Sequence, residues 1–457
     1  MNDFSLGIDF GTSGARAIAI NRTGEILAIT RTDYQLRDYA TWQIALYELI
    51  RALPIKIKRN IGRILIDGTS ATVLLCDRQG KAIAPAMIYS DRCPLEVLEV
   101  IQQIVPNDSI ACNVSSSFAK LVTLIEQIDL ARPSSDTASN LLYLLHQADW
   151  LGYCLHGKLG FSDYHNALKL GYDPQILDYP AWLKMWFKAS GHAQSLVLPQ
   201  VCAPSHPVGI IQAAIAQKLA LPLDCEIVAG TTDSNAAFIA TIGTAAPALG
   251  TAVTSLGSTM VLKVVSDRPI NNANYGIYSH RWDYASHNSP QDCLWLVGGA
   301  SNVGGAVLRQ FFEQQQLLDL SAILNDRLNP YYPSPLDYYP LPQTGDRFPI
   351  NDPALKPRLE PRHADPVEFL HGLLESMARI EAQGYDLLQN MGAAPVTQVY
   401  TAGGGAKNAV WTKIRDRHLP NLQSLSTDPL KTEAAYGSAL LALGLPLGII
   451  SASSAAT

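Results

Sequence analysis

The chain opens with the stretch Leu6-Gly7-Ile8-Asp9-Phe10-Gly11-Thr12-Ser13-Gly14, an apolar strand that leads one carboxylate into a turn of glycine and hydroxyl residues. Such a turn lets backbone N–H groups and hydroxyls face anionic oxygens, and Asp9 is placed to hold a divalent cation through water. The apolar run 15–20, the turn residues 21–24 and the run 25–29 predict a β-hairpin whose tip contacts phosphate. No Walker loop ending in Lys and Ser or Thr occurs in the chain. Because Gly-Thr-Ser turns also occur in ordinary hairpins, this stretch alone leaves a purely structural role open.

The length of the chain predicts more than one domain. Its 457 residues exceed what one hydrophobic core usually serves, so we expect two lobes, residues 1–243 and 244–457, with a cleft between them. Hydrophobic residues make up 47% and charged residues 16%, which is typical of a large, well-buried α/β enzyme and argues against disorder.

Charge and cysteine content exclude several classes of function. The formal net charge is −6, with 34 basic and 40 acidic residues and no basic run, so we expect neither nucleic acid nor an anionic membrane surface as a partner. Seven scattered cysteines without a C-x-x-C pair indicate neither a zinc site nor a disulfide framework. Asp3 stands where a signal peptide would carry positive charge, and no apolar segment follows, so we expect a cytoplasmic protein.

The uncharged stretch 434–457 is interrupted by Gly437, Gly444, Pro446 and Gly448. We therefore expect a buried helix followed by a loose tail rather than a membrane span.

The opening pattern occurs again. Residues 66–71 repeat Ile-Asp and Gly-Thr-Ser, followed by an apolar run, 73–76, and a polar turn that ends in Gly80. Two such hairpins would place two Gly-Thr-Ser turns side by side, although both runs could also be successive strands of one sheet. A third glycine-hydroxyl turn, within 249–262, predicts that the second lobe opens as the first does.

Helical periodicity marks two further elements. Apolar residues recur at helical spacing from Trp42 to Leu53, which predicts a helix ending at Pro54, and again from Val367 toward Met391. The proline-rich stretch 329–361 predicts a long irregular connection between the second lobe's elements.

Three segments carry candidate chemistry. In 228–237, a strand and tight turn lead to Asp233 at the start of an Ala-rich helix, where it is either a helix N-cap or a general base for an attacking hydroxyl. In 399–408, three glycines follow a strand and permit close approach to a flat ligand, although a Gly-rich turn alone is weak support. In 433–439, small residues on one side of a helix either pack tightly or leave room for an adenine.

Taken together and in order, these segments resemble the FGGY carbohydrate kinases of the actin, heat-shock-70 and hexokinase ATPase superfamily. The resemblance runs from 7–12 to 433–439 and includes 345–349, which is similar to the family's G-E-R-x-P element. It implies an α/β fold of two RNase H-like lobes with MgATP in the cleft between them. The first lobe would serve the sugar and phosphate side and the second the nucleotide side, with transfer of the γ-phosphoryl group to a sugar hydroxyl.

The resemblance also implies roles for individual residues. Asp233 would be the base, and Asp9 and Asp233 would be the catalytic pair and the metal ligands. The sugar would contact Asp9, Thr69, Ser70, Asp233 and Ser234. The nucleotide and its phosphates would contact Gly11, Thr12, Ser13, Arg16, Gly257, Ser258, Thr259, Gly299, Gly403, Gly404, Gly405 and Asn408.

The chain departs from the family pattern on the sugar side. Many members carry a Gln or a Met-His pair where this chain reads Asp67-Gly68-Thr69-Ser70, and Asp91 in a segment similar to W-x-D-x-R is either a sugar contact or a surface turn residue. The Gly-Thr-Ser form most resembles the D-ribulose and xylulose kinase-like proteins of cyanobacteria and plants. This implies a ketopentose, D-ribulose first and D-xylulose as the alternative.

Two other classes stay open at this point. One is an actin-like or chaperone-like ATPase that drives a partner, and the other is a catalytically quiet nucleotide-binding regulator. The chain shows no evident insertion for polymer contacts, and Asp9 and Asp233 are both retained, so a kinase is the favoured interpretation. The sequence does not determine the oligomeric state.

Overall fold

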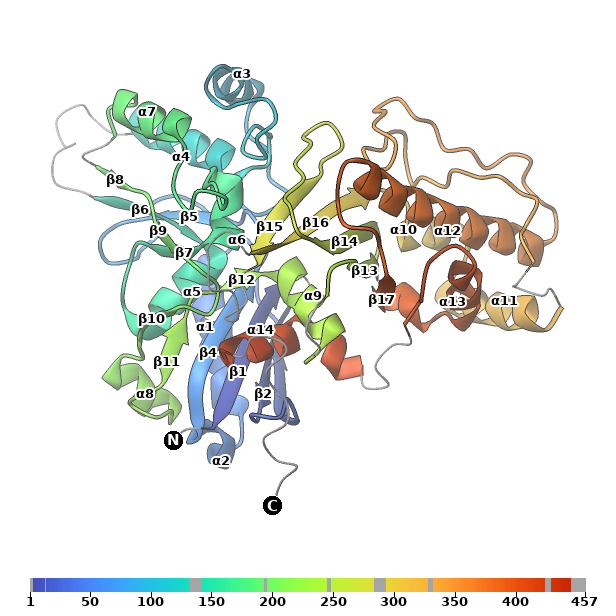
Figure 1. The fold of residues 1–457 in the computed structure, drawn as a ribbon. Helices are drawn as coiled ribbons and strands as arrows, with labels where there is room; N and C mark the ends of the chain where they lie inside the picture. The colour runs from blue at the N-terminus through green and yellow to red at the C-terminus, as the bar shows by residue number, and fades with distance from the viewer. Residues whose placement is uncertain are drawn as a thin grey trace. The chain divides into compact units, whose positions relative to one another are not determined.

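The computed structural model describes residues 3–12, 14–131, 141–192, 195–244, 248–282, 293–327, 332–423 and 429–444. The chain forms two compact units, Met1–Ala246 together with Pro429–Thr457, and Pro247–Asp428 (Figure 1). Below they are called unit 1 and unit 2.

Unit 1 is built on a seven-stranded sheet in which β12 lies beside β4. Its order is β10-β11-β4-β1-β2-β3. The strands are β1 (Phe4–Gly11), β2 (Gly14–Ile20), β3 (Ile26–Thr32), β4 (Ile61–Gly68), β10 (Pro207–Ile210), β11 (Glu226–Val228) and β12 (Thr231–Thr232). The predicted opening hairpin is confirmed, because β1 and β2 pair antiparallel over their whole length.

Helices cover both faces of this sheet. They are α1 (Tyr39–Ala52), α2 (Ile55–Lys58), α5 (Gln147–His156), α8 (Ala213–Leu219), α9 (Asp233–Ile242) and α14 (Ala434–Ala442), with the short helix η3 (Pro429–Thr432) before α14. The predicted helix up to Pro54 is α1, and its Trp42 and Leu46 belong to the same buried hydrophobic cluster as Leu6 and Ile8 of β1. Since side chains alternate along a strand, Gly7 and Asp9 face the opposite side, where α14 packs.

Two glycines allow α14 to pack between β1 and α9 (Figure 1). A Cβ on Gly7 would lie 2.1 Å from the carbonyl oxygen of Ala435, and a Cβ on Gly437 would lie 1.9 Å from that of Ala236. No real Cβ contact is so short, so both positions require glycine. The small-residue face of 433–439 therefore serves tight packing, one of the two roles expected for it.

The compact units differ from the expected lobes 1–243 and 244–457 at the carboxyl end. The chain passes from unit 1 to unit 2 near residue 246, close to the expected boundary, but the segment from Pro429 returns to unit 1. The reason is the contact of α14 with β1 and α9, which the order of residues along the chain does not reveal.

The rest of unit 1 forms smaller layers. Its strands are β5 (Val73–Cys76), β6 (Leu142–His146), β7 (Phe161–Asp163), β8 (Leu196–Val197) and β9 (Gln200–Cys202), and its helices are α3 (Leu95–Ile104), α4 (Ser117–Ala131), α6 (Tyr164–Ala167), η1 (Leu168–Leu170) and α7 (Ala181–Ala189). The prediction of a second hairpin after β4 is wrong. Ala71, in the left-handed region at φ 62°, lies between β4 and β5, and β5 pairs with β6 in a separate sheet.

Unit 2 repeats the topology of the opening of unit 1. Its five strands, in the order β15-β16-β14-β13-β17, are β13 (Thr251–Leu256), β14 (Met260–Ser266), β15 (Tyr278–Trp282), β16 (Leu294–Ser301) and β17 (Gln398–Ala402). The hairpin β13-β14 is antiparallel and β17 runs parallel to β13, as β4 runs parallel to β1. The expectation that both halves open alike is confirmed.

The helices of unit 2 are α10 (Gly305–Phe311), α11 (Gln314–Arg327), α12 (Pro366–Asn390), η2 (Gly404–Lys407) and α13 (Ala409–Asp416). The predicted helix from Val367 is α12, which begins where the Asp365 side chain accepts a hydrogen bond from the Val367 N–H at 2.9 Å. Residues 332–361 contain neither helix nor strand, as expected of an irregular connection. No helix in the described ranges has both the length and the apolarity that crossing a membrane requires.

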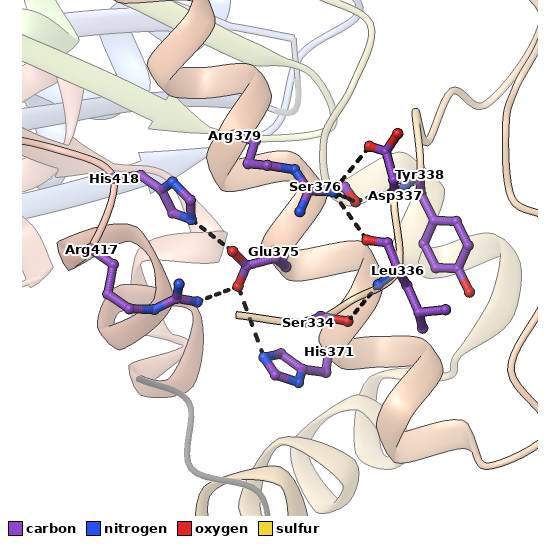
Figure 2. Close-up of polar contacts among 10 residues, drawn as sticks. All are labelled: Ser334, Leu336, Asp337, Tyr338, His371, Glu375, Ser376, Arg379, Arg417 and His418. Atoms are coloured by element: carbon purple, nitrogen blue, oxygen red, sulfur yellow. Dashed lines mark hydrogen bonds and ion pairs between the residues drawn. The ribbon is translucent and has the colours of Figure 1, made fainter. Parts of the chain in front are cut away.

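A buried carboxylate fastens α12 to the end of α13 (Figure 2). Glu375 of α12 is fully buried and accepts hydrogen bonds from Arg417 and from His418 Nε2, the latter at 2.8 Å. His371, one turn earlier, lies 3.9 Å from the same carboxylate. Burial raises the pKa of Glu375, but its bonds to His418 and Arg417 outweigh burial, so the pKa lies below its ordinary value. This network belongs to the core of unit 2.

Candidate active site

Strand register brings two carboxyl groups together in unit 1. Asp9 of β1 lies directly opposite Asp67 of the parallel strand β4, and both side chains face α14. Thr231 of β12 lies opposite Asp67 on its other side, and Asp233 follows two residues later at the start of α9. Three carboxyl groups therefore gather where neighbouring parallel strands end.

The pair Asp9 and Asp67 is strongly perturbed. The pKa of Asp9 is raised to about 6, mainly by burial and also by the charge of Asp233, while the hydrogen bond with Asp67 opposes the rise. Burial and the charge of Asp9 raise the pKa of Asp67 well above its ordinary value, although Ser438 Oγ donates to Asp67 Oδ2 at 2.5 Å. Two adjacent buried carboxyl groups do not both ionise easily, so ionisation of one disfavours ionisation of the other.

Asp67 was not assigned to the site from the sequence. The signal was present, because Ile-Asp precedes Gly-Thr in both copies of the repeated motif. What sequence alone could not reveal is that both copies end parallel neighbouring strands.

A cationic side chain, Arg16, lies beside this pair in the sheet, and its charge lowers the pKa of Asp9. It lies opposite Asp9 on β2, and its Nε is 3.7 Å from Glu433 Oε2. Arg31, opposite Arg16 on β3, contacts the other oxygen of Glu433 at 2.7 Å. The Arg16 side chain is 37% exposed, so its guanidinium is accessible to an anion.

The first Gly-Thr-Ser turn follows β1. Thr12 is exposed, and Gly11 is partly exposed while its carbonyl accepts a hydrogen bond from the Tyr34 hydroxyl at 2.6 Å. Gly14 has φ 134°, a conformation that favours glycine. Ser13, expected to contact the phosphates, lies outside the described residues.

The second turn, residues 68–72, lies beside the first because β1 and β4 are neighbours. Thr69 is buried, and its backbone N–H and its hydroxyl both lie 3.0 Å from Gln147 Oε1. The amide nitrogen of Gln147 donates to the Tyr34 hydroxyl at 3.4 Å, which links this turn to Gly11. The prediction of two adjacent turns is confirmed, while the Thr69 hydroxyl is engaged inside the protein. Ser70 is partly exposed.

Asp233 lies in the first turn of α9. Thr232 is the N-cap residue, and Asp233 Oδ1 accepts from the adjacent Ser234 N–H at 2.7 Å, so the N-cap interpretation of Asp233 is wrong. Ser234 is exposed beside it.

The strand before Asp233 is held by α6. His165 Nδ1 and Thr231 Oγ1 are 2.7 Å apart, and Asn166 Nδ2 donates to the Thr231 carbonyl at 3.2 Å. Asn166 also donates to Asp163 at 2.6 Å. Sequence reasoning missed this support, for which the polar run 163–166 was the available signal.

In unit 2, the turn between β13 and β14 exposes two hydroxyls. The carbonyls of Gly257 and Ser258 accept from the N–H groups of Gly305, at 2.9 Å, and Ala306, at 3.1 Å. Ser258 and Thr259 are exposed, and the Ser258 hydroxyl accepts from Arg309 at 2.7 Å.

Gly299, also expected at the nucleotide, is instead buried in β16. A Cβ there would lie 2.7 Å from the ring of Phe348, so the glycine makes room for an aromatic core residue. Nearby, the carboxylate of Asp346 accepts from Ser301 Oγ at 2.7 Å and from the Asn302 N–H at 3.0 Å. The motif 345–349 thus fastens a loop to the end of β16.

The three glycines after β17 have different surroundings. A Cβ on Gly403, at φ 82°, would lie 2.7 Å from the Leu256 carbonyl oxygen, and one on Gly405 would lie 2.6 Å from the Trp411 ring. Gly404 is exposed and has no neighbouring atom within 4 Å of such a Cβ. Asn408 caps α13 through the Val410 and Trp411 N–H groups, both at 3.1 Å, and its amide donates to Ser321 at 3.0 Å.

The carboxyl groups of unit 1 are suited to a metal ion that binds together with a nucleotide. Among the described residues, no group of three or more His, Cys, Asp or Glu side chains is arranged to hold a metal by itself. Mg²⁺ characteristically binds through one or two carboxylates together with water and substrate phosphates. The carboxyl groups of Asp9 and Asp233 have the chemistry of this kind of site.

Comparison with known proteins identifies the family. A model of the N-terminal domain of the FGGY family of carbohydrate kinases matches residues 4–240, and a model of the C-terminal domain matches residues 252–443.

Individual relatives match over most of the chain at low identity. The xylulose kinase of Klebsiella pneumoniae is 24% identical, over 95% of this chain and 88% of that protein. The rhamnulokinase of Pectobacterium carotovorum subsp. carotovorum is 22% identical, over 76% of this chain and 67% of that protein. The crystal structure of a xyloylose kinase from Brucella ovis has a TM-score of 0.77 at 20% identity, over 96% of this chain and 90% of that chain. The expected two-domain α/β fold is confirmed, and it is consistent with the expected actin- and hexokinase-like lobes. With both domain models matched in order, the chain belongs to the FGGY family of carbohydrate kinases.

Proposed function

We propose that this sugar kinase transfers the γ-phosphoryl group of ATP to a hydroxyl of a ketopentose, D-ribulose, with D-xylulose as the alternative acceptor. The observation that carries the proposal is the position of Asp233. It is a partly exposed carboxylate in the first turn of a helix, next to the Asp9–Asp67 pair and to the strand ends that carry both Gly-Thr turns.

Asp233 acts as the general base. A carboxylate within hydrogen-bond reach of the acceptor hydroxyl takes its proton as the oxygen attacks phosphorus. The bonds of His165 and Asn166 to Thr231 fix the backbone that leads into α9, and therefore fix the direction of this carboxylate.

Asp9 would be a ligand of the metal ion. Asp9, together with Asp233, would hold a Mg²⁺ ion bound with ATP, and the ion would supply positive charge to the phosphate oxygens. Asp67, hydrogen-bonded to Asp9 and to Ser438, keeps the Asp9 carboxyl group in one orientation.

The glycine-hydroxyl turns bind phosphate oxygens. In unit 1 the backbone at Gly11 and the hydroxyl of Thr12 are available, together with the guanidinium of Arg16. In unit 2 the hydroxyls of Ser258 and Thr259 are exposed, and the open backbone at Gly404 offers a flat surface for the adenosine.

The choice of a ketopentose rests on the second turn and on the relatives. Ser70 presents a hydroxyl, whereas that of Thr69 is engaged with Gln147 and Thr72. Two of the similar proteins described above are named xylulose or xyloylose kinases, and D-xylulose differs from D-ribulose only in configuration at C3. The Gly-Thr-Ser form of the turn favours D-ribulose.

The test measures ADP release from MgATP with D-ribulose, D-xylulose, L-ribulose, L-rhamnulose, glycerol and aldopentoses, each against a control without sugar. Strong stimulation by D-ribulose, with a lower KM than for D-xylulose, is the expected result. Preference for another sugar would overturn the substrate assignment. Equal, slow hydrolysis with every sugar would favour an ATPase that acts on a partner.

A further inference from the structure

One buried cation in unit 1 has no role in the chemistry described above. Lys120, in the first turns of α4, has no exposed surface. Its ammonium donates two short hydrogen bonds to backbone carbonyls, one to Ala71 at 2.6 Å and one to Ile88 at 2.7 Å. Both acceptors are loop residues distant from Lys120 in the sequence.

The Ala71 carbonyl belongs to the second turn, and the Ile88 carbonyl belongs to a loop beside that turn. Ala71 directly follows Ser70 and has φ 62°, a conformation that non-glycine residues rarely adopt. Ile88 opens the segment that ends at Asp91, and its N–H donates to Asp91 Oδ2 at 2.9 Å. Lys120 therefore joins the turn that carries Ser70 to a neighbouring loop.

A hydroxyl joins the same two segments independently. Thr72 Oγ1 accepts from the Tyr89 N–H at 2.9 Å and lies 2.6 Å from Thr69 Oγ1. Asp91, the last residue of the second segment, forms a bidentate ion pair with Arg37, whose two terminal nitrogens lie 2.7 and 3.0 Å from the carboxylate oxygens. Of the two roles expected for Asp91, sugar contact or surface turn residue, these contacts support the second.

Burying an ammonium is costly, so its presence here needs a reason. The pKa of Lys120 is lowered to about 7, mainly by burial and also by the charge of Lys169, while the charge of Asp91 opposes the shift. An apolar side chain of similar length would avoid this cost and fill the same space. An apolar side chain cannot donate a hydrogen bond to the Ala71 carbonyl. It therefore cannot stabilise the left-handed backbone conformation that follows Ser70.

We infer that Lys120 is a positioning residue for the sugar, which fixes the 68–72 turn so that the Ser70 hydroxyl has one defined direction. The inference rests on the proposed function, because it takes Ser70 as a sugar contact. Sugar recognition then depends on Lys120, whereas nucleotide binding does not.

The experiment compares Lys120→Met with Lys58→Met in the full-length protein. Lys58 is a matched control, because it too is largely buried, and its ammonium donates to the Arg51 carbonyl at 3.1 Å between α1 and α2. KM for the preferred sugar, KM for MgATP, kcat and the melting temperature are measured for each. We expect Lys120→Met to raise the sugar KM about 3- to 10-fold with the MgATP KM within about two-fold of wild type, and Lys58→Met to change neither.

A second variant keeps the test decisive if Lys120→Met does not fold. Thr72→Val preserves shape and removes only the hydroxyl that joins the same segments, so it should raise the sugar KM in the same selective way. Lys120→Arg, which keeps a cationic donor, should recover part of the sugar affinity.

The inference is overturned if folded Lys120→Met or Thr72→Val binds the sugar as wild type does. It is also overturned if the KM values for sugar and MgATP rise together with a loss of melting temperature, since that is the result of a merely structural role. Wild-type protein that no sugar stimulates would instead refute the proposed function, and the inference with it.

Discussion

Ser438 donates a hydrogen bond of 2.5 Å to Asp67, a residue 371 positions earlier in the chain. The helix that carries Ser438 thereby fixes the carboxyl group that is paired with Asp9. Ser438→Ala removes the donor and leaves a buried carboxyl oxygen unsatisfied, so we expect the free energy of unfolding to fall by about 1–3 kcal/mol. Denaturant unfolding measures this effect, and Ser205→Ala, which removes another side-chain bond to α14, is the control for loss of α14 packing alone. If Ser438→Ala and Ser205→Ala lower the free energy of unfolding equally, the hydrogen bond to Asp67 stabilises the protein no more than any other contact of α14.

Asp233→Ala tests the general base. Removing the carboxylate should lower kcat by roughly 10²- to 10⁴-fold, because the acceptor hydroxyl then has no proton acceptor. The Kd of MgATP, measured by calorimetry, should change far less. Ser234→Ala is the control, since it alters the adjacent exposed residue and leaves the carboxylate in place. Unchanged turnover in Asp233→Ala would refute the assignment.

The stability of the ligand-free protein should depend on pH through Asp9. Its pKa is raised from 3.8 to about 6 in the folded state, so the folded protein holds more protons than the unfolded chain between these values. The contribution of this group to stability is fully present below pH 3.8 and is lost as pH rises through 6, with a slope of at most about 1.4 kcal/mol per pH unit.

Urea unfolding at several pH values, without Mg²⁺ or nucleotide, measures this slope. In Asp9→Asn the decline between pH 4 and pH 6 should become shallower. An identical pH profile in the variant would show that Asp9 does not carry a raised pKa.

Two hydroxyls of the second turn, those of Thr69 and Ser70, have different predicted consequences. Ser70→Ala should raise the sugar KM about 3- to 10-fold and leave the melting temperature unchanged, because its hydroxyl is available to a ligand. Thr69→Val should lower the free energy of unfolding by about 1–3 kcal/mol, because Gln147 and Thr72 lose a buried partner. Thermal melts and sugar kinetics are measured for both variants. If Thr69→Val raises the sugar KM and Ser70→Ala lowers stability instead, the sugar contact is Thr69 and not Ser70.

The glycines after β17 offer a second matched pair. Gly403→Ala places a Cβ 2.7 Å from the Leu256 carbonyl oxygen at a positive φ, so it should destabilise unit 2 by about 1–3 kcal/mol or more. Gly404→Ala meets no atom within 4 Å and should leave stability unchanged while raising the KM for MgATP. If the KM for MgATP of Gly404→Ala equals that of the wild type, the adenosine does not bind at Gly404.

The elements that the sequence predicted correctly are those with a local cause. The hairpins β1-β2 and β13-β14 and the helix α12 follow from alternation, turn residues and capping within one segment. The order of these motifs was also enough to indicate the family, and both domain models match.

The parts that could not be predicted depend on contacts between distant segments. The polar run after β4 looks like a hairpin turn, but whether β5 pairs with β4 or β6 is decided by chain remote from the turn. Thr69 and Ser70 are adjacent hydroxyls, and only the arrival of Gln147 from α5 buries one of them. Likewise, the site role of Asp67 depends on Asp9 and Ser438 and not on its immediate neighbours.

The return of α14 to unit 1 imposes an order on synthesis. The ribosome completes every element of unit 2, a continuous segment, before it makes the helix that fills the space between Gly7 and α9. Domains generally fold as units during synthesis, so unit 2 can mature first although its amino-terminal neighbour emerges earlier. Until α14 arrives, Gly7 and α9 lack the helix that packs against them, and Asp67 lacks its hydrogen bond from Ser438. The contacts of the Asp9–Asp67 pair are therefore completed only after all of unit 2 has been made.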